Sequence, residues 1–325
     1  MEQTHCGEIM RIIFSFILII STLFSQEWGG RPGGFLRMGL TARSIAMGSG
    51  FTAELDQSFP TFHNPAWSAF LTQRHFGTSY SNLTFDRRLA ATSVALALPP
   101  TAGIGIAWIY GGVGKIQGRY TTGLKSTEMQ TGENAVLITF AQRVVPWLSF
   151  GANFKLLRYD LPITKSDQIS GTGIGFDIGI LFKTGKFTTF GLMVQDINSN
   201  YQWDTNEIYT QGGPYKDMFP IIFRFGSRYN KNDLTIVGDI GFITDSVTKL
   251  TKNEHLFFGF LPRIGVEYGF LEQYFFRGGF GNGRFAFGLG YEYGLMNQRD
   301  SHIDYSFSLD WATQSTHTIS YAYNF

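Results

Sequence analysis

Large apolar residues alternate with small polar ones through most of this chain, and no other feature limits its fold as much. In residues 301 to 312 the apolar members are Ile303, Tyr305, Phe307, Leu309 and Trp311. The same alternation recurs in four other stretches: 171–183, 257–270, 283–294 and 315–325. Successive side chains of a strand point to opposite faces, so each stretch predicts a β-strand with one greasy face and one small polar face.

The residues on the polar face distinguish a soluble sheet from a membrane barrel. A soluble β-sandwich has an aliphatic inner face and an outer face rich in lysine and glutamate. Here the polar face is mostly glycine, alanine, serine and aspartate, and charged residues make up only 16% of the chain. Transmembrane barrels show this inverse pattern, with apolar side chains toward lipid and small or polar ones toward the lumen. The sequence therefore predicts an all-β, antiparallel outer-membrane barrel.

About fourteen strand-like segments are present, each near the 9 to 11 residues that a tilted strand needs to cross a bilayer. They lie at 73–85, 87–98, 101–111, 134–145, 147–160, 171–183, 187–196, 219–229, 232–243, 257–270, 273–281, 283–294, 301–312 and 315–325. An even number suits a single-chain bacterial barrel. We expect the barrel to occupy residues 72 to 325 and to lie in a bacterial outer membrane.

The connections between these segments alternate in length. Short ones fall at Pro99–Pro100, Pro146, 184–186, 230–231 and Leu271–Glu272. Long ones fall at 112–133, 161–170, 197–218 and 244–256. Outer-membrane barrels have short periplasmic turns and longer outer loops, so this order predicts that both chain ends are periplasmic. The outer connections near Asn282 and Thr313 are short, which predicts a low rim there.

Residues 1 to 25 have the features of a leader with a signal peptide. Arg11 precedes an apolar run from Ile12 to Leu23, and small and polar residues follow. This run is too short for a membrane helix, which needs about 20 apolar residues. We expect an exported protein whose mature chain begins near Gln26. The only cysteine, Cys6, precedes that point, so neither disulfides nor Cys-based metal sites are expected.

Charge and motifs argue against nucleic-acid binding and against catalysis. The formal net charge is +1 and no long basic run is present, whereas nucleic-acid binding needs a concentrated positive face. His302, Asp304, Asp310 and His317 with nearby serines could suggest a Ser-His-acid set, but they share no catalytic motif. Interior barrel strands need polar residues in any case. We expect a protein that is not an enzyme and has no cofactor.

Residues 26 to 71 do not alternate. Within 33 to 70, short apolar clusters are interrupted by Gly39, Gly48 and Gly50, which favours short helical turns over strands. A barrel of this width has a cavity to fill. We therefore predict that this segment forms a hatch inside the lumen, with Asn64 to Ala66 as a tight turn that sets it against the wall.

The same segment carries a family resemblance. "GGFLRMGLTARSIAMGSGFTAEL" followed by "NPAWSA" resembles the entry signature of the PorV/PorQ family, which is related to FadL-type outer-membrane barrels. The matching residues are Phe35, Leu36, Gly39, Ala42, Arg43, Ala46, Met47, Gly48, Phe51, Thr52, Ala53, Asn64, Pro65 and Ala66. Two departures are the acidic pair, split here as Glu54-Leu55-Asp56, and Trp67 in place of the usual glycine. The matched signature covers about the N-terminal tenth of the chain.

The resemblance implies a barrel of about fourteen strands with an N-terminal hatch. It implies one of two functions. The first is a PorV-like component of type IX protein secretion, with secreted cargo proteins or secretion-system components as partners; the second is a FadL-like transporter of hydrophobic small molecules. A transporter should have an apolar pocket behind the hatch and a lateral opening, for which Pro262 is one candidate kink. The resemblance also implies that Phe325 is the signal read by the barrel assembly machinery, with outer-membrane lipid around the finished barrel.

Several charged residues fall on the polar face of their strands. They are Asp177, Arg224, Arg228, Asp239, Arg263, Glu267, Arg277, Asp304 and Asp310. One hypothesis is that they line a permeation path or anchor the hatch. The other is that they pair with one another inside a filled lumen, because an uncompensated buried charge is costly.

Three further patterns carry expectations. The long loop at 198–219 is rich in tyrosine, tryptophan, asparagine and glycine, which suits either partner contacts or lipid headgroups. The glycine clusters at 171–175 and 278–283 are followed by no helix, so they are expected to be strand glycines where the lumen is crowded. On the last strand, Ile319 and Tyr321 should face lipid, and arginine should be tolerated at the lumen-facing Ser320.

Overall fold

The computed structural model describes residues 30–55, 59–162, 168–206, 210–244, 258–294, 299–310 and 314–325. The predicted leader, with Arg11 and Cys6, lies outside these residues, as do Asp56 and most of the connection at 244–256. No helix in the described ranges is long and apolar enough to cross a membrane.

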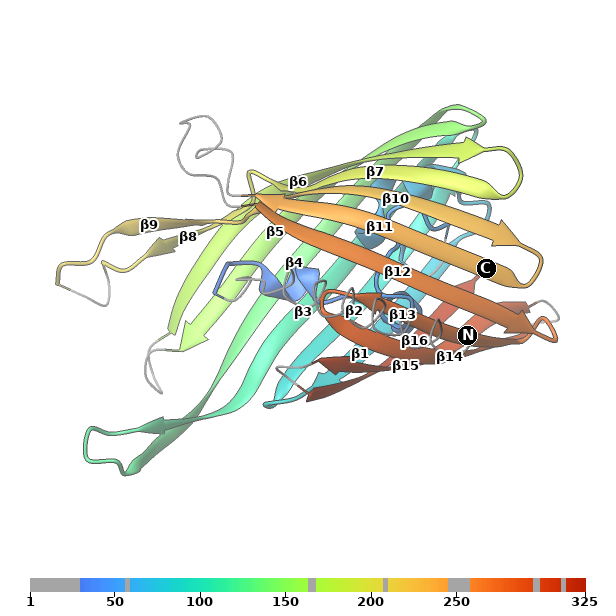
Figure 1. Cartoon of the computed structure of the whole chain (residues 1–325). Helices are drawn as coiled ribbons and strands as arrows, with labels where there is room; N and C mark the ends of the chain where they lie inside the picture. The colour runs from blue at the N-terminus through green and yellow to red at the C-terminus, as the bar shows by residue number, and fades with distance from the viewer. Residues whose placement is uncertain are drawn as a thin grey trace, which may run out of the picture. The chain divides into compact units, whose positions relative to one another are not determined.

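Fourteen antiparallel strands form a closed barrel, which confirms the predicted fold (Figure 1). They are β1 (His75–Leu83), β2 (Arg87–Leu98), β3 (Ala102–Arg119), β4 (Lys125–Val145), β5 (Leu148–Pro162), β6 (Gln168–Thr184), β7 (Thr188–Ile197), β10 (Ile221–Lys231), β11 (Leu234–Thr244), β12 (Phe258–Phe270), β13 (Tyr274–Gly281), β14 (Arg284–Gly294), β15 (Arg299–Asp310) and β16 (Gln314–Asn324). Each pairs with its neighbours along the chain, and β7 pairs with β10 across the inserted hairpin of β8 (Asn200–Asp204) and β9 (Pro214–Met218).

The first and last strands close the ring. His75 of β1 lies opposite Asn324 of β16, and the pairing continues in register to Asn82 opposite His317. Beyond the strand ends, the backbone N–H groups of Arg74 and Phe325 each donate to the other residue's carbonyl at 3.0 Å. No sheet edge is left open at this seam, which removes the unpaired row of backbone groups that lipid could not satisfy.

The two faces of the wall differ as the alternation predicts. On β14, Phe285, Phe287 and Leu289 are 49–59% exposed, whereas Ala286 between them is 2% exposed. Large exposed apolar residues recur in this way around all the barrel strands described, which is far more than a soluble surface carries. The outer face is therefore suited to the hydrocarbon of a bilayer.

Arginine at Ile319 tests which face meets lipid. Ile319 is 59% exposed near the middle of β16, so Ile319→Arg should destabilise the barrel by about 2 to 4 kcal/mol. Gln130→Arg, at an exposed position in the first third of β4, is the matched control and should cost less than about 1 kcal/mol. Urea unfolding of lipid-reconstituted protein, followed by heat-modifiability on gels, measures both. Equal losses would contradict the assignment of the faces.

The lumen side of β16 differs from the sequence expectation. Ser320 is 2% exposed, and its Oγ accepts a hydrogen bond from the Ala42 backbone N–H at 2.5 Å. Arginine there would displace the hatch, so the structure argues against the expectation that Ser320→Arg is tolerated. The physical reason is that the lumen beside Ser320 is packed with protein instead of being filled with water.

Strand ends beyond the membrane also differ from the prediction. β3 has 18 residues and β4 has 21, so most of the predicted loop at 112–133 is a paired extension in which Ile116 lies opposite Met129. Alternation is weak there because both faces of the extension are solvated, which hid the strands from the sequence pattern. The predicted loop at 197–218 likewise contains β8 and β9. β13 has only 8 residues, so the rim is uneven.

The described part of the hatch contains four short helices inside the barrel: η1 (Gly34–Arg37), α2 (Ala42–Ala46), α3 (Pro60–His63) and η2 (Pro65–Phe70) (Figure 1). Thr41 and Ser44 form a capping box at the start of α2, each side chain accepting from the other's backbone N–H. Pro60 and Pro65 begin the next two helices, where their missing N–H costs nothing. Local sequence therefore fixes where α2, α3 and η2 begin.

Candidate functional site

Two glycines of the family-like signature allow close packing, Gly39 within the hatch beside Ile45 and Ser49, and Gly48 against the wall. Gly39 and Gly48 have φ of 90° and 64°, the left-handed region that favours glycine. A Cβ atom at Gly48 would overlap the carbonyl oxygens of Ile264 and Phe280 on the wall. Met47 beside it is fully buried against Phe51 and Val237. The signature residues therefore act at a close backbone contact.

Asn64, Pro65 and Ala66 form a turn that is hydrogen-bonded to the wall. The Asn64 Oδ1 accepts from the Ala66 backbone N–H at 3.1 Å, and its Nδ2 donates to carbonyls of Thr52, Ile180 and Leu192 at 2.8 to 3.4 Å. Ala66 accepts from the Ser149 hydroxyl at 2.8 Å. One asparagine thus joins two parts of the hatch to β6 and β7.

A chain of ion pairs joins the hatch to one side of the barrel. Its contacts are Arg228–Glu54 at 2.9 Å, Glu54–Arg43 at 3.7 Å, Arg43–Glu267 at 2.8 Å, Glu267–Arg277 at 2.5 Å and Arg277–Asp304 at 2.6 Å. Arg43 and Glu54 belong to the hatch, and the other four residues face inward from β10, β12, β13 and β15. Charges alternate along the chain, so each buried carboxylate has a guanidinium on both sides or at its end.

The remaining charges predicted for the lumen have separate partners. Asp177 accepts from Lys155 Nζ at 2.6 Å and from the Asp196 backbone N–H at 2.9 Å, and Lys155 also pairs with the Asp196 carboxylate. Arg263 donates to Asn282 Oδ1 and to the Ser49 carbonyl.

Asp310 pairs with Arg284 at 2.9 Å near the rim. The Nε of Arg224 is buried without a hydrogen-bond partner among the described residues, and so is the Oδ1 of Asp239. Asp239 accepts from the backbone and hydroxyl of Thr52 in the hatch. Most of the inward charges are thus matched by the hatch or by one another, and Arg224 is an exception within the described ranges.

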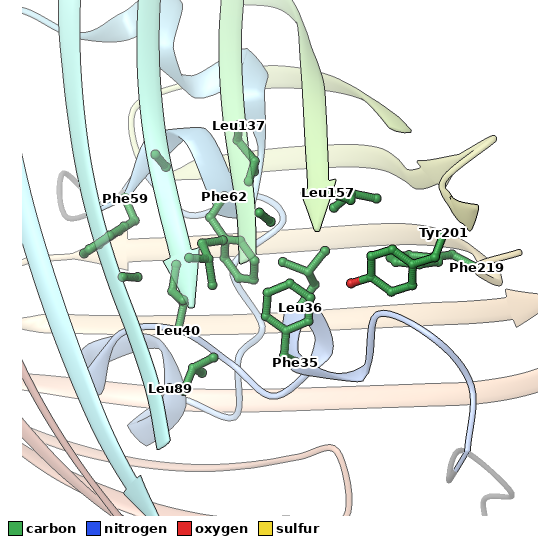
Figure 2. Close-up of a cluster of buried hydrophobic side chains, with 14 of the residues drawn as sticks. Phe35, Leu36, Leu40, Phe59, Phe62, Leu89, Leu137, Leu157, Tyr201 and Phe219 are labelled. Atoms are coloured by element: carbon green, nitrogen blue, oxygen red, sulfur yellow. The ribbon is translucent and has the colours of Figure 1, made fainter. Parts of the chain in front are cut away.

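The opposite side of the lumen is apolar, which the sequence expectation of a small polar face did not include. Phe35 and Leu36 of η1, with Leu40, Phe59 and Phe62, pack against inward aliphatic residues of β1 to β5. Figure 2 shows Phe35 and Leu36 between Phe62 and Tyr201. The wall residues of this apolar cluster are Leu83, Leu89, Ala91, Ala107, Ile109, Ala135, Leu137 and Leu157.

The aromatic residues of the loop at 198–219 belong to the same apolar cluster. Tyr201, Trp203 and Phe219 are 0%, 8% and 1% exposed. They are therefore not available for the partner or lipid contacts that the sequence analysis expected of this loop. Residues 199 to 203 fold onto the inner face of β6, where a Cβ at Gly171, Gly173 or Gly175 would overlap them. We call residues 199 to 203 the inward segment.

The inward segment reaches across to β4. The Tyr201 hydroxyl donates to Glu133 Oε2 at 2.9 Å. Burial, together with the nearby Glu133 carboxylate, raises the pKa of Tyr201 above its ordinary value, so the phenol stays protonated and remains a donor. Tyr201 therefore covers this end of the apolar cluster, and it is fixed both by packing in the cluster and by its hydrogen bond to Glu133.

The barrel wall is irregular at β7. The register between β6 and β7 shifts between Phe176 and Ile178, which leaves one extra residue on β7, and Asp196 has φ of 62°. Inside the bulge is a cavity of about 10 Å³ lined by Arg37, Gln195 and the Lys155 cluster, large enough for about one water. Outside it is a pocket of about 280 Å³ over β6, β7, β10 and β11, lined by Leu192 and Phe225 among others.

Pro262 is not the irregular point. Its strand β12 stays in register with β11 from Phe258 to Tyr268, and Pro262 lies opposite Ile240. The pairing with β13 begins only at Arg263, so the missing N–H of the proline breaks no ladder bond.

The four residues of the possible catalytic set are separated. Asp304 faces the lumen and pairs with Arg277, whereas His317 lies on the outer face, where its Nδ1 is 2.8 Å from the Tyr305 hydroxyl. His302 lies 4.0 Å from Glu292, and Asp310 pairs with Arg284. No nucleophile, base and acid converge among them.

Lys155, Asp196 and Glu54 were missed as site residues. Lys155 had a signal, because it shares the inward parity of Asn153 on β5. Asp196 had none, since the bulge changes its face. The terminal residue Phe325 is 52% exposed, and its ring stacks on that of Tyr323 with 5.5 Å between the ring centres.

Comparisons with known proteins give structural likeness only. No protein-family model and no curated protein matches the chain. The toluene transporter TodX of Pseudomonas putida has a TM-score of 0.61 at 14% identity, over 88% of this chain and 99% of that one.

Two other solved structures are similar. The CymD monoaromatic hydrocarbon channel has a TM-score of 0.62 at 13% identity, over 88% of this chain and 98% of that one. A FadL homologue of Pseudomonas aeruginosa has a TM-score of 0.59 at 11% identity, with the same coverage. The chain therefore has the fold of FadL-like outer-membrane β-barrels.

Proposed function

We propose that this protein is an outer-membrane channel for hydrophobic small molecules. The observation that carries the proposal is the apolar cluster, which runs from Tyr201 and Trp203 past Phe35 and Leu36 to the inner wall of β2 to β5. A channel for water-soluble solutes needs a polar lumen, whereas this side of the lumen offers only apolar contacts.

The bulge in β7 supports the same proposal. It interrupts the β6–β7 ladder where an apolar pocket lies outside the wall and a small cavity, lined by both polar and apolar residues, lies inside. A transporter that releases ligand sideways needs a weak point of this kind. With the alternation of short and long connections, we place the outer loops at the β3–β4 and β8–β9 side and the chain ends in the periplasm.

The structures with similar folds support a transport function as well, since two of them are described as a toluene transporter and a monoaromatic hydrocarbon channel. The type IX secretion function implied by the N-terminal resemblance has no such support. Of the two hypotheses from the sequence, the hydrophobic-compound channel is therefore the one we carry forward.

Uptake of radiolabelled toluene tests the proposal. The host is a bacterium whose own channels for hydrophobic compounds are deleted, and cells with and without this chain are compared at dilute toluene. We expect faster toluene uptake with the chain and no change in sucrose uptake, because the hatch fills the lumen. Equal toluene uptake in the two strains would contradict the proposal.

A matched pair of variants locates the route. Leu137→Asn puts an amide into the apolar cluster and should slow toluene uptake about tenfold, because an apolar ligand cannot satisfy it. Thr316→Asn puts the same amide at a buried inward position outside that cluster, and asparagine has nearly the volume of threonine. This variant should leave uptake unchanged. The reverse order would exclude the apolar side as the route.

A further inference from the structure

We infer that the inward segment, which includes most of β8, is the outer gate of the apolar cluster. It opens when the whole β8–β9 hairpin moves away from β6. The inference rests on the proposed transport function. The segment covers Phe35 and Leu36, and Phe219 at the hairpin base covers Gly33, where a Cβ would overlap its ring. A ligand arriving from the β8–β9 side therefore meets Tyr201 and Phe219 before the hatch.

The hairpin shares little backbone pairing with the barrel. β8 and β9 pair from Asn200–Met218 to Asp204–Pro214, and the Phe219 N–H donates to the Ser199 carbonyl at 2.9 Å. To the barrel strand β6, in contrast, β8 is joined through one residue pair, Thr172 opposite Gln202. The hairpin therefore keeps its own ladder if it moves.

The backbone is irregular at the point where such a movement would begin. Asp196, the penultimate residue of β7, and Asn198, between β7 and β8, both have positive φ, 62° and 54°. Pro220 lies on the return path just before β10. Rotation at these two places would lift the segment from Gly171, Gly173 and Gly175 without disturbing the β7–β10 ladder.

Side-chain contacts hold the gate closed. Tyr201 packs on Tyr159 of β5 at 5.6 Å between ring centres, and its hydroxyl donates to Glu133 of β4. Aromatic contacts of this kind are exchangeable, because an apolar ligand offers the same rings equivalent contacts. Opening would also break the hydrogen bond from the Tyr201 hydroxyl to Glu133, and an apolar ligand cannot replace that bond.

A reversible disulfide tests the gate in the full chain with Cys6→Ser, which removes its only cysteine. Thr172→Cys with Gln202→Cys ties the hairpin to β6, since directly opposed residues of an antiparallel pair have a separation that suits a disulfide. Gln202→Cys with Lys216→Cys is the matched control, because it links β8 only to β9.

Toluene uptake is compared after oxidation and after reduction. Oxidation should slow uptake at least about tenfold in the first pair, because the open state is lost, and should have no effect in the control pair. Unchanged uptake with the first disulfide formed, as shown by mass spectrometry, would overturn the gate. Lack of uptake by the reduced protein would instead count against the proposed function.

A second measurement does not depend on transport. Spin labels at Lys216 on β9 and Lys125 on β4 report the hairpin position by pulsed EPR. Tyr201→Phe removes only the hydroxyl and should raise the long-distance population about tenfold, since a hydrogen bond of this kind is worth about that factor. A single distance that is identical in both proteins would overturn the gate even if toluene is transported.

Discussion

Deleting residues 35 to 66 should raise the ion conductance of the barrel in planar bilayers at least about tenfold, because a barrel of this width without its filling leaves an aqueous channel. The intact lumen is blocked by helices whose backbone touches the wall, as at Met47 and Gly48. Ions cannot follow the apolar side of the lumen, so the intact protein should conduct poorly even while it passes hydrophobic compounds.

A cross-linked hatch is the control for this deletion. Ala42 and Ser320 are in contact, so Ala42→Cys with Ser320→Cys should fix the hatch to β16 and keep conductance low after oxidation. Heat-modifiability on gels shows whether each barrel has folded. A folded deletion variant with unchanged conductance would mean that the hatch does not block the pore.

Glu267→Ala should remove about 3 to 5 kcal/mol from the free energy of unfolding, the range seen when one partner of a buried ion pair is deleted. Glu267 is 6% exposed and accepts from Arg43 at 2.8 Å twice and from Arg277 at 2.5 Å. Without it the two guanidinium groups face each other in the lumen. Urea unfolding in lipid vesicles measures the loss.

Glu128→Ala is the matched control for this carboxylate. Glu128 is exposed in the first third of β4, and its replacement should change stability by about 0.5 kcal/mol or less. Limited proteolysis adds a second readout, because the hatch should become cleavable in Glu267→Ala before the barrel unfolds. Similar losses in the two variants would mean that the ion-pair chain does not anchor the hatch.

The wall of the barrel could be predicted from the sequence because one physical rule acts on every second residue. Lipid requires an apolar side chain such as Phe287, and the crowded lumen requires a small one such as Gly288. Where that rule stops, the prediction failed: beyond the membrane, Ile116 and Met129 are paired although their strands do not alternate.

The contents of the lumen could be predicted only in part. The parity of Glu267 placed it inside, but its partner Arg43 lies 224 residues away in a segment without periodicity. Tyr201 and Trp203 have the composition of a surface loop, and only the spacing of Gly171, Gly173 and Gly175 indicated that something packs on β6. The apolar side of the lumen was missed because Leu137 and its neighbours Val136 and Ile138 are apolar on both faces of β4.

The most direct test of a hydrophobic route is a crystal structure of the full chain soaked with 4-bromotoluene, whose bromine gives an anomalous signal. The expected result is a bromine peak within the apolar cluster, between Phe35 and Leu137 or beneath Tyr201. Bromine peaks found only beside the Arg43–Glu267 ion pair or only on the outer wall would contradict a route along the apolar side of the lumen.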